Sequence, residues 1–401
     1  MNARLRLTTT TLLISIVAAP ALAQDSRADA IRQQQSDRQQ YLSPPQKNTA
    51  ERVLDRLERW GFISGPPRGL HPWGGSIYPG SGFAAGVGAR QPFGDDGAVS
   101  VFSGYSIGSS AIAQAAVSLP TFADGRGTLS LTGRYIDAPD VKYFGVGNDT
   151  SKDDRTRFGY SPTSGAARLG FELTDRLAAT AEITYLQVDT SAARTAPSIE
   201  ERFDPTDTPG LEQSQFDFVT ATAGLAYDSR RRLGYGGRGG LYRANVTEYR
   251  DRNRGTYSFR SFEAEARQLI PILRGNWVIA LRAIATVTDV DAEREVPYFL
   301  LPSVGGGSTV RGYQDFRFRD RNRLVMNAEL RWTPSRFMDM ALFYDAGKVE
   351  ASRQDLDFDN LKDGYGIGIR LIGPRGYAFR VEAARSVEHR ARLIVSAGGA
   401  F

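Results

Sequence analysis

The sequence contains no cysteine and only two histidines, His71 and His389, among its 401 residues. The lack of cysteine excludes disulfide bonds and cysteine-based metal sites. Two histidines are too few for a multi-histidine metal centre, and a Ser-His-Asp enzyme would have to use one of them. Neither histidine has a nearby constellation of serine and aspartate. The sequence therefore predicts no catalytic residue, no metal site and no cofactor.

Long hydrophobic runs are also missing, because no stretch approaches the roughly 20 apolar residues that a membrane-spanning helix needs. Residues 1–23 instead have the features of a secretory signal peptide. Arg4 and Arg6 precede a short apolar run, and a small-residue cleavage site (Ala-Leu-Ala) ends at Ala23. Gln24 rather than cysteine follows, which argues against a lipoprotein. The sequence predicts an exported protein without a helical anchor.

The segment before residue 66 differs in composition from the rest of the chain. Residues 24–48 are rich in glutamine, serine, aspartate and arginine, which predicts a flexible leader. Residues 49–61 predict an amphipathic helix that Thr49 caps and Gly61 ends. This helix could pack against another part of the protein, or it could serve as a plug or a periplasmic contact.

Residues 66–401 show short segments in which apolar and polar residues alternate, the pattern of β-strands. The segment 323–332 shows it best, and its apolar face consists of Leu324, Met326, Ala328, Leu330 and Trp332. The opposite face carries Arg323, Asn327, Glu329 and Arg331. A soluble sandwich also alternates, but here glutamate and arginine recur on the polar face, while the apolar face ends in aromatic residues. These features favour a membrane β-barrel with a polar lumen.

The number and spacing of these segments support an antiparallel all-β barrel of sixteen strands. We place the strands near 69–79, 82–93, 97–107, 111–121, 126–138, 155–173, 177–190, 214–229, 239–250, 256–270, 275–289, 323–333, 337–347, 363–372, 376–386 and 389–401. Short and long links largely alternate, as expected for periplasmic turns and outer loops, and both termini then lie in the periplasm. The exception is 230–238, which is long for a turn.

The longest link, 290–322, carries the motif GGGSTVRGY. Its motif residues are Gly305, Gly306, Gly307, Val310, Arg311, Gly312 and Tyr313. This motif resembles that of the BamA/TamA superfamily of outer-membrane assembly and translocation barrels, also called the bacterial surface antigen family. The resemblance implies that the link folds into the lumen, where Arg311 pairs with Glu329 and Asp345 as a lumen-loop lock. The alternating pattern independently places both carboxylates on the polar face.

The resemblance covers about residues 66–401, which include the whole predicted barrel and its C-terminus, but it does not extend to the segment before the barrel. It implies that the aromatic terminal residue, Phe401, is an assembly signal for the machinery that inserts the barrel. Gly398 and Gly399 lead to the hypothesis of a softened seam between first and last strands, although simple curvature is an equal alternative. Well-studied members carry periplasmic POTRA modules, and residues 24–65 are too few for one of them. We therefore expect a member without POTRA modules.

Three functions follow from these observations. The leading expectation is an outer-membrane barrel, not an enzyme, that assists insertion or translocation of proteins or possibly lipids. The alternative is a passive pore or surface antigen in which Arg311 and its partners only hold the loop. The third is an outer-membrane lipase. The expected partners are outer-membrane lipids and lipopolysaccharide, the barrel assembly machinery and a client outer-membrane or secreted protein, without nucleic acid.

Overall fold

The computed structural model describes residues 68–397 except for 234–235, 274–275, 336–337 and 374–375. The predicted signal peptide, leader and helix 49–61, and also Gly398, Gly399 and Phe401, lie outside the described residues. Within the described part of the chain, no helix is long and apolar enough to span a membrane. The remaining description concerns the barrel unit alone.

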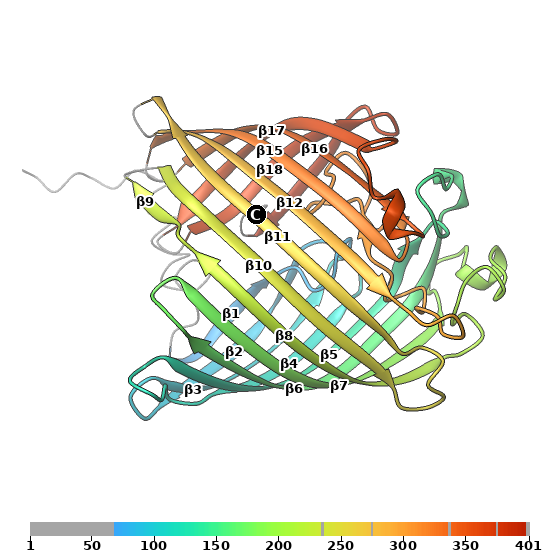
Figure 1. Ribbon diagram of the computed structural model, residues 1–401, viewed down its shortest axis with the longest axis horizontal. Helices are drawn as coiled ribbons and strands as arrows, with labels where there is room; N and C mark the ends of the chain where they lie inside the picture. The colour runs from blue at the N-terminus through green and yellow to red at the C-terminus, as the bar shows by residue number, and fades with distance from the viewer. Residues whose placement is uncertain (1–67, 234–235, 274–275, 336–337, 374–375, 398–401) are drawn as a thin grey trace, which may run out of the picture. The chain divides into compact units, whose positions relative to one another are not determined.

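The barrel wall consists of antiparallel strands (Figure 1). Each pairs with the wall strands before and after it in the chain, so that β8 pairs with β10 and β12 with β15. Its first half comprises β1 (Gly69–Gly75), β2 (Ala84–Phe93), β3 (Gly97–Ser106), β4 (Ala111–Ser118), β5 (Gly127–Tyr143), β6 (Thr156–Glu172), β7 (Leu177–Ala192), β8 (Gln215–Asp228) and β9 (Arg231–Leu233). Its second half comprises β10 (Gly236–Asp251), β11 (Phe259–Ile272), β12 (Trp277–Asp289), β15 (Asn322–Ser335), β16 (Met338–Glu350), β17 (Lys362–Gly373), β18 (Gly376–Ser386) and β19 (Arg392–Ala397). Short 3-10 turns in the described links lie at Lys152–Asp154, Ile199–Glu201 and Arg353–Asp355.

The prediction of a sixteen-stranded antiparallel barrel is confirmed. The short β9 and the longer β8 pair with successive parts of β10, so together they occupy one position in the wall. The pairing of β9 with β10 also accounts for the link 230–238, which is long for a turn. Its arginine- and glycine-rich sequence hides the alternating pattern, but residues 231–233 there pair with residues 236–238 and extend the wall beyond the β8–β10 ladder.

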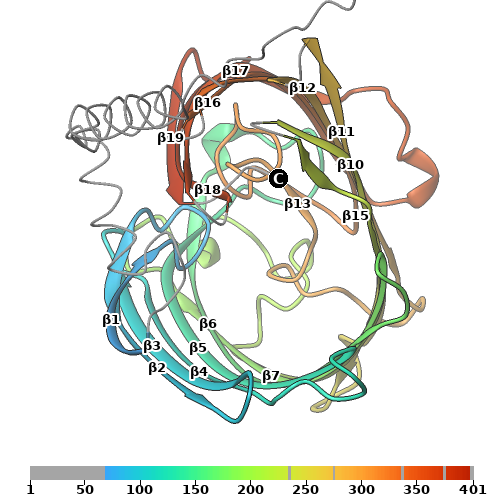
Figure 2. The same ribbon diagram turned by 90° about the vertical axis from the view of Figure 1, so that its left-hand side faces the viewer.

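The two ends of the barrel differ in the length of their links. The long links 144–155, 193–214, 290–321 and 351–361 all lie at one end, here called the long-loop end. Links at the opposite end, the turn end, include 94–96, 173–176 and 273–276. β1 and β19 are the two ends of the sheet (Figure 2). Within the described residues, β1 pairs with β2 and β19 with β18, and no ladder joins β1 to β19.

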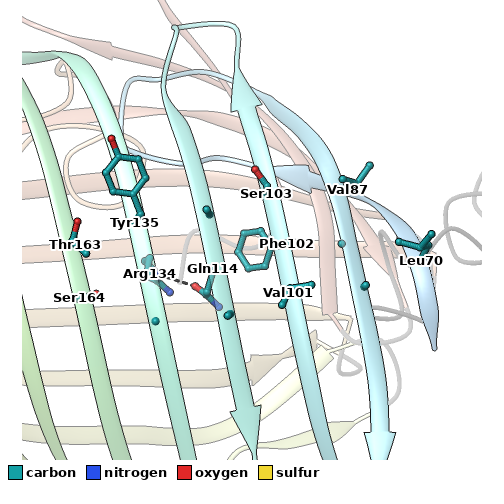
Figure 3. A pocket seen from close by; sticks show the side chains of 15 residues that line it. Leu70, Val87, Val101, Phe102, Ser103, Gln114, Arg134, Tyr135, Thr163 and Ser164 are labelled. Atoms are coloured by element: carbon teal, nitrogen blue, oxygen red, sulfur yellow. Dashed lines mark hydrogen bonds between the residues drawn. The ribbon is translucent and has the colours of Figure 1, made fainter.

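The outer face of the wall is apolar and uneven, as a lipid-facing surface requires. One shallow hollow of about 600 Å³ lies across β2 to β6. Val87, Val101 and Tyr135 stand around it in Figure 3. Small residues such as Ala115 and Gly133 form its floor. The hollow thus results from alternating large and small side chains on the outer face.

The lumen holds an aromatic cluster at the long-loop end. The cluster combines the ends of β5, β6 and β8 with the link 290–321, which lies inside the ring of strands in Figure 2. Its buried rings belong to Tyr143, Phe158, Tyr160, Phe216, Phe218, Tyr257, Tyr298 and Phe299. Many of these pairs meet edge to face, as for Phe158 and Tyr298 at 4.8 Å between ring centroids. The link is therefore packed against the first half of the barrel at this end.

Candidate functional site

The motif loop, residues 303–319 of the link 290–321, has a compact conformation that its own hydrogen bonds maintain. The two-residue strands β13 (Ser303–Val304) and β14 (Phe318–Arg319) pair with each other at its base. Gly305 adopts a φ of 113°, and a Cβ there would lie 2.3 Å from the carbonyl oxygen of Gln314. The Thr309 hydroxyl donates to the Gly305 carbonyl at 2.9 Å and accepts from its amide at 2.9 Å. These constraints fix the position of the following residues, Val310 to Tyr313.

Arg311 points from this loop into the barrel wall and is 1% exposed. Its Nε and Nη2 donate to the two carboxylate oxygens of Asp345 on β16, both at 2.7 Å. Nη1 donates to Glu329 on β15 at 2.7 Å and to Glu382 on β18 at 3.0 Å. The backbone amide of Arg311 also donates to Asp345, at 3.1 Å. One guanidinium group therefore connects the loop with three strands of the wall.

The partners of Arg311 are shared with further arginines, which together form the buried ion network. Arg370 on β17 donates to both oxygens of Glu329, at 2.6 and 2.8 Å, and to Glu382 at 3.0 Å. Arg331 donates to Glu329 at 2.7 Å, and Arg380 donates to Glu382 at 3.2 Å. Burial of unpaired charge is costly, whereas these charges are paired by directional hydrogen bonds.

The loop and the wall approach each other closely because glycines lie at the contact, Gly364 and Gly366 on β17 and Gly312 in the loop. The Arg311 guanidinium lies over the ring of Phe343, 3.5 Å from its centroid. That ring fits because Gly366 lies opposite Phe343 on β17, where a Cβ would be 2.5 Å from a ring carbon. Gly312 lies against Gly364, and a Cβ on Gly312 would be 2.7 Å from the Arg385 carbonyl oxygen. These glycines allow the loop backbone to approach the sheet closely.

The electrostatics of the site keep Arg311 charged. Burial alone would lower the pKa of Arg311, but the hydrogen bonds and charge of Asp345 and the charges of Glu329 and Glu382 raise it overall. Asn327 adds a neutral donor, since its side-chain amide bonds Asp345 at 2.8 Å and the Thr309 carbonyl at 2.7 Å. The site is thus a permanent ionic anchor rather than a proton-transfer centre.

Two further arginines anchor the loop nearer the long-loop end. Arg317 donates to the carboxylate of Glu388, in the β18–β19 link, at 2.7 and 2.9 Å. It also donates to the hydroxyl of Thr150, in the β5–β6 link, at 2.8 Å. Arg319 is fully buried in the aromatic cluster, and its guanidinium donates, among the described residues, to the carbonyl oxygens of Tyr298 and Lys142, each at 3.3 Å. Burial lowers the pKa of Arg319, in contrast to Arg311.

The structure brings the three residues of the predicted lumen-loop lock, Arg311, Glu329 and Asp345, into direct contact. Sequence reasoning missed Glu382, which is fully buried and completes the set of three carboxylates. Alternation along β18 puts Glu382 on the polar face, but its height relative to Arg311 depends on strand register. Phe401, Gly398 and Gly399 lie outside the described residues, so their assembly and seam roles stay predictions.

The two histidines do not form a catalytic arrangement in the described part of the chain. Among the described residues the His71 ring makes one local hydrogen bond, which Nδ1 donates to the Gly69 carbonyl at 3.1 Å. His389 lies in a tight turn where its backbone amide, not its ring, bonds the Ser386 hydroxyl. No group of three or more metal-ligating side chains occurs among the described residues.

Known proteins with the same fold were found by comparison of the sequence and of the structure. The Omp85 superfamily domain matches residues 106–398. BamA from Haemophilus ducreyi lacking POTRA domains 1-3 superimposes with a TM-score of 0.60 at 15% identity, covering 87% of this chain and 78% of that one. CdiB from Escherichia coli gives a TM-score of 0.57 at 16% identity, covering 82% of this chain and 62%, less than two thirds, of that one. Such low identities show a shared fold alone. No curated protein matches the sequence.

Proposed function

Because the chain belongs to the Omp85 superfamily of bacterial outer-membrane barrels, we propose that it assists the insertion or translocation of proteins at that membrane. As a member of this superfamily the protein is not an enzyme. The observation that supports the proposal best is the Arg311 anchor. A passive pore gains nothing from a loop that is tied to three strands through three carboxylates.

The proposal extends to the partners expected from the sequence. The client is an unfolded outer-membrane or secreted protein that approaches from the periplasm. Outer-membrane lipids and lipopolysaccharide surround the wall, and the barrel assembly machinery inserts the protein itself, with Phe401 as the signal. Residues 68–397, with their gaps, form the barrel and its loops and include no POTRA module. Client capture would therefore fall to the barrel or to residues outside the described part.

The function is tested by reconstituting the purified protein into lipid vesicles and adding a urea-unfolded small outer-membrane barrel as client. We expect faster appearance of the folded, heat-modifiable client than with empty vesicles, and loss of this acceleration in Arg311→Ala. Arg260→Gln is the matched control, because Arg260 faces away from the lumen and bonds a single carboxylate, Glu248. Equal insertion rates with and without the protein would refute the proposal.

Planar-bilayer conductance separates the passive-pore alternative from the proposed function. A loop held in the lumen predicts that the wild type is nearly closed and that Arg311→Ala opens or flickers. Steady and equal conductance in both proteins, without accelerated client insertion, would favour a passive pore. The lipase alternative requires hydrolysis that is lost in His389→Ala, and the geometry around His389 gives that alternative no support.

A further inference from the structure

The end of the motif loop lies beside the seam between β1 and β19, the first and last strands of the described sheet. β1 and β19 are the two ends of the sheet, and within the described residues no ladder joins them. An open sheet edge in lipid leaves backbone groups without partners, which is costly. Contacts that bridge the two edges among the described residues would therefore help to hold them in position.

On the β19 side, the loop is bound through Asp315. Arg392 of β19 donates to the Asp315 carboxylate at 2.8 Å, and both side chains are largely buried, at 20% and 15% exposed. The same guanidinium also donates to the carbonyl oxygens of Arg311 and Tyr313. Two residues further along, Arg317 holds Glu388 in the link that leads into β19. The start of β19 is thus attached to the loop by charged hydrogen bonds.

On the β1 side, the same short segment packs against the link that joins β1 to β2. Asp315 lies against Gly80, where a Cβ would be 3.6 Å from the carboxylate. The next residue, Phe316, meets the ring of Tyr78 with 5.4 Å between centroids. Phe316 adopts a φ of 61°, a conformation that costs energy for a bulky residue. This strained backbone directs the Phe316 ring toward Tyr78 while Asp315 faces Arg392.

We infer that Asp315 and Phe316 form a clasp across the seam, with Asp315 as the positioning residue that fixes β19 relative to the β1–β2 link. The clasp joins the two sides of the seam by one ion pair with β19 and one aromatic contact with the β1–β2 link. It differs from the Arg311 anchor, which ties the loop to β15, β16 and β18 but not to either edge strand through a side chain. The inference goes beyond the proposed function, because it concerns the wall and holds for any client.

The test measures the seam directly in the intact protein. Because the chain has no cysteine, Leu70→Cys on β1 and Leu393→Cys on β19 give two clean sites for spin labels, and both side chains face outward at 85% and 70% exposed. We expect a narrow distance distribution that becomes broader and longer in Asp315→Asn and in Arg392→Gln. Amide exchange in β19 should become about five- to tenfold faster, the effect of losing one partly buried ion pair.

Matched variants distinguish a clasp from general loosening of the loop. Asp320→Asn changes the same residue type in the same loop, but the Asp320 side chain bonds only the neighbouring amide of Arg321 among the described residues. It should leave the seam distances unchanged, and Asp315→Glu should restore them. Unchanged distances in both Asp315→Asn and Arg392→Gln, or an equal change in Asp320→Asn, would overturn the inference. Client insertion is scored separately, so failure of the proposed function leaves this result interpretable.

Discussion

Replacing Arg311 by methionine is expected to destabilise the barrel strongly. The change removes four side-chain hydrogen bonds, two to Asp345 and one each to Glu329 and Glu382. The three carboxylates are affected unequally. Glu329 and Glu382 keep Arg370, whereas Asp345 is left with Asn327 and one backbone amide. An uncompensated carboxylate in a buried position costs about 3–5 kcal/mol, and we expect a loss of this size.

Double-mutant analysis can assign this loss to the Arg311–Asp345 pair. Asp345→Asn alone leaves Arg311 with Glu329 and Glu382, so its effect should be smaller than that of Arg311→Met. The double variant should be more stable than the sum of the two losses predicts, by at least about 2 kcal/mol. Unfolding in guanidinium chloride, followed by the fluorescence of the four tryptophans in detergent micelles, measures these free energies.

The control for this series is Arg260→Met, which removes a guanidinium from the outer face. Arg260 is about half exposed and bonds Glu248 on the neighbouring strand. Because Arg260 is the second residue of β11 and lies at the long-loop rim beside the β10–β11 link, water can screen this pair, so its loss should change the unfolding free energy far less than Arg311→Met. A loss below about 1 kcal/mol for Arg311→Met, or strict additivity with Asp345→Asn, would refute the account of the anchor.

Three other changes test separate parts of the loop. Gly312→Ala places a Cβ 2.7 Å from the Arg385 carbonyl oxygen, so guanidinium unfolding should show a loss of about 1–3 kcal/mol, and wild-type stability would contradict the close approach. Arg319→Met exchanges a buried arginine without a carboxylate partner among the described residues, so the same assay should show a change below about 1.5 kcal/mol, and a loss as large as for Arg311 would contradict it. Burial and the charges of Glu388 and Asp363 raise the pKa of Tyr313 to about 12. Because the unfolded phenol ionises near pH 10, the contribution of Tyr313 to stability should be complete below pH 10 and lost by about pH 12. Tyr313→Phe should reduce the pH dependence in this range, and identical alkaline unfolding curves for both proteins would contradict the shift.

The barrel wall was largely predictable because its signal is local. On β15, the alternation of Leu324 and Met326 with Asn327 and Glu329 reports which side of the sheet each residue faces. Link lengths then identify the two ends. The β9 hairpin was missed because arginine and glycine dominate residues 230–238, and backbone pairing there extends the wall without an apolar face.

The candidate site was predictable only in part because it depends on register. Glu329 and Asp345 could be assigned to Arg311 through the family motif. Glu382 could not, because its height depends on how β17 and β18 are staggered, including an irregularity between Leu371 and Ile372. The seam contact of Asp315 involves residues 77 positions apart, and no pattern in the sequence indicates such a pairing.

The position of the anchor in the chain also has a consequence for the order of folding. Each carboxylate that receives Arg311 lies after it in the sequence, on β15, β16 and β18. Until β15, β16 and β18 have assembled around the loop, whichever end of the wall forms first, the guanidinium lacks these buried partners. It can be fully paired inside the lumen only when these three strands, all in the second half of the wall, are in place. Burial of Arg311 thus reports the assembly of β15, β16 and β18.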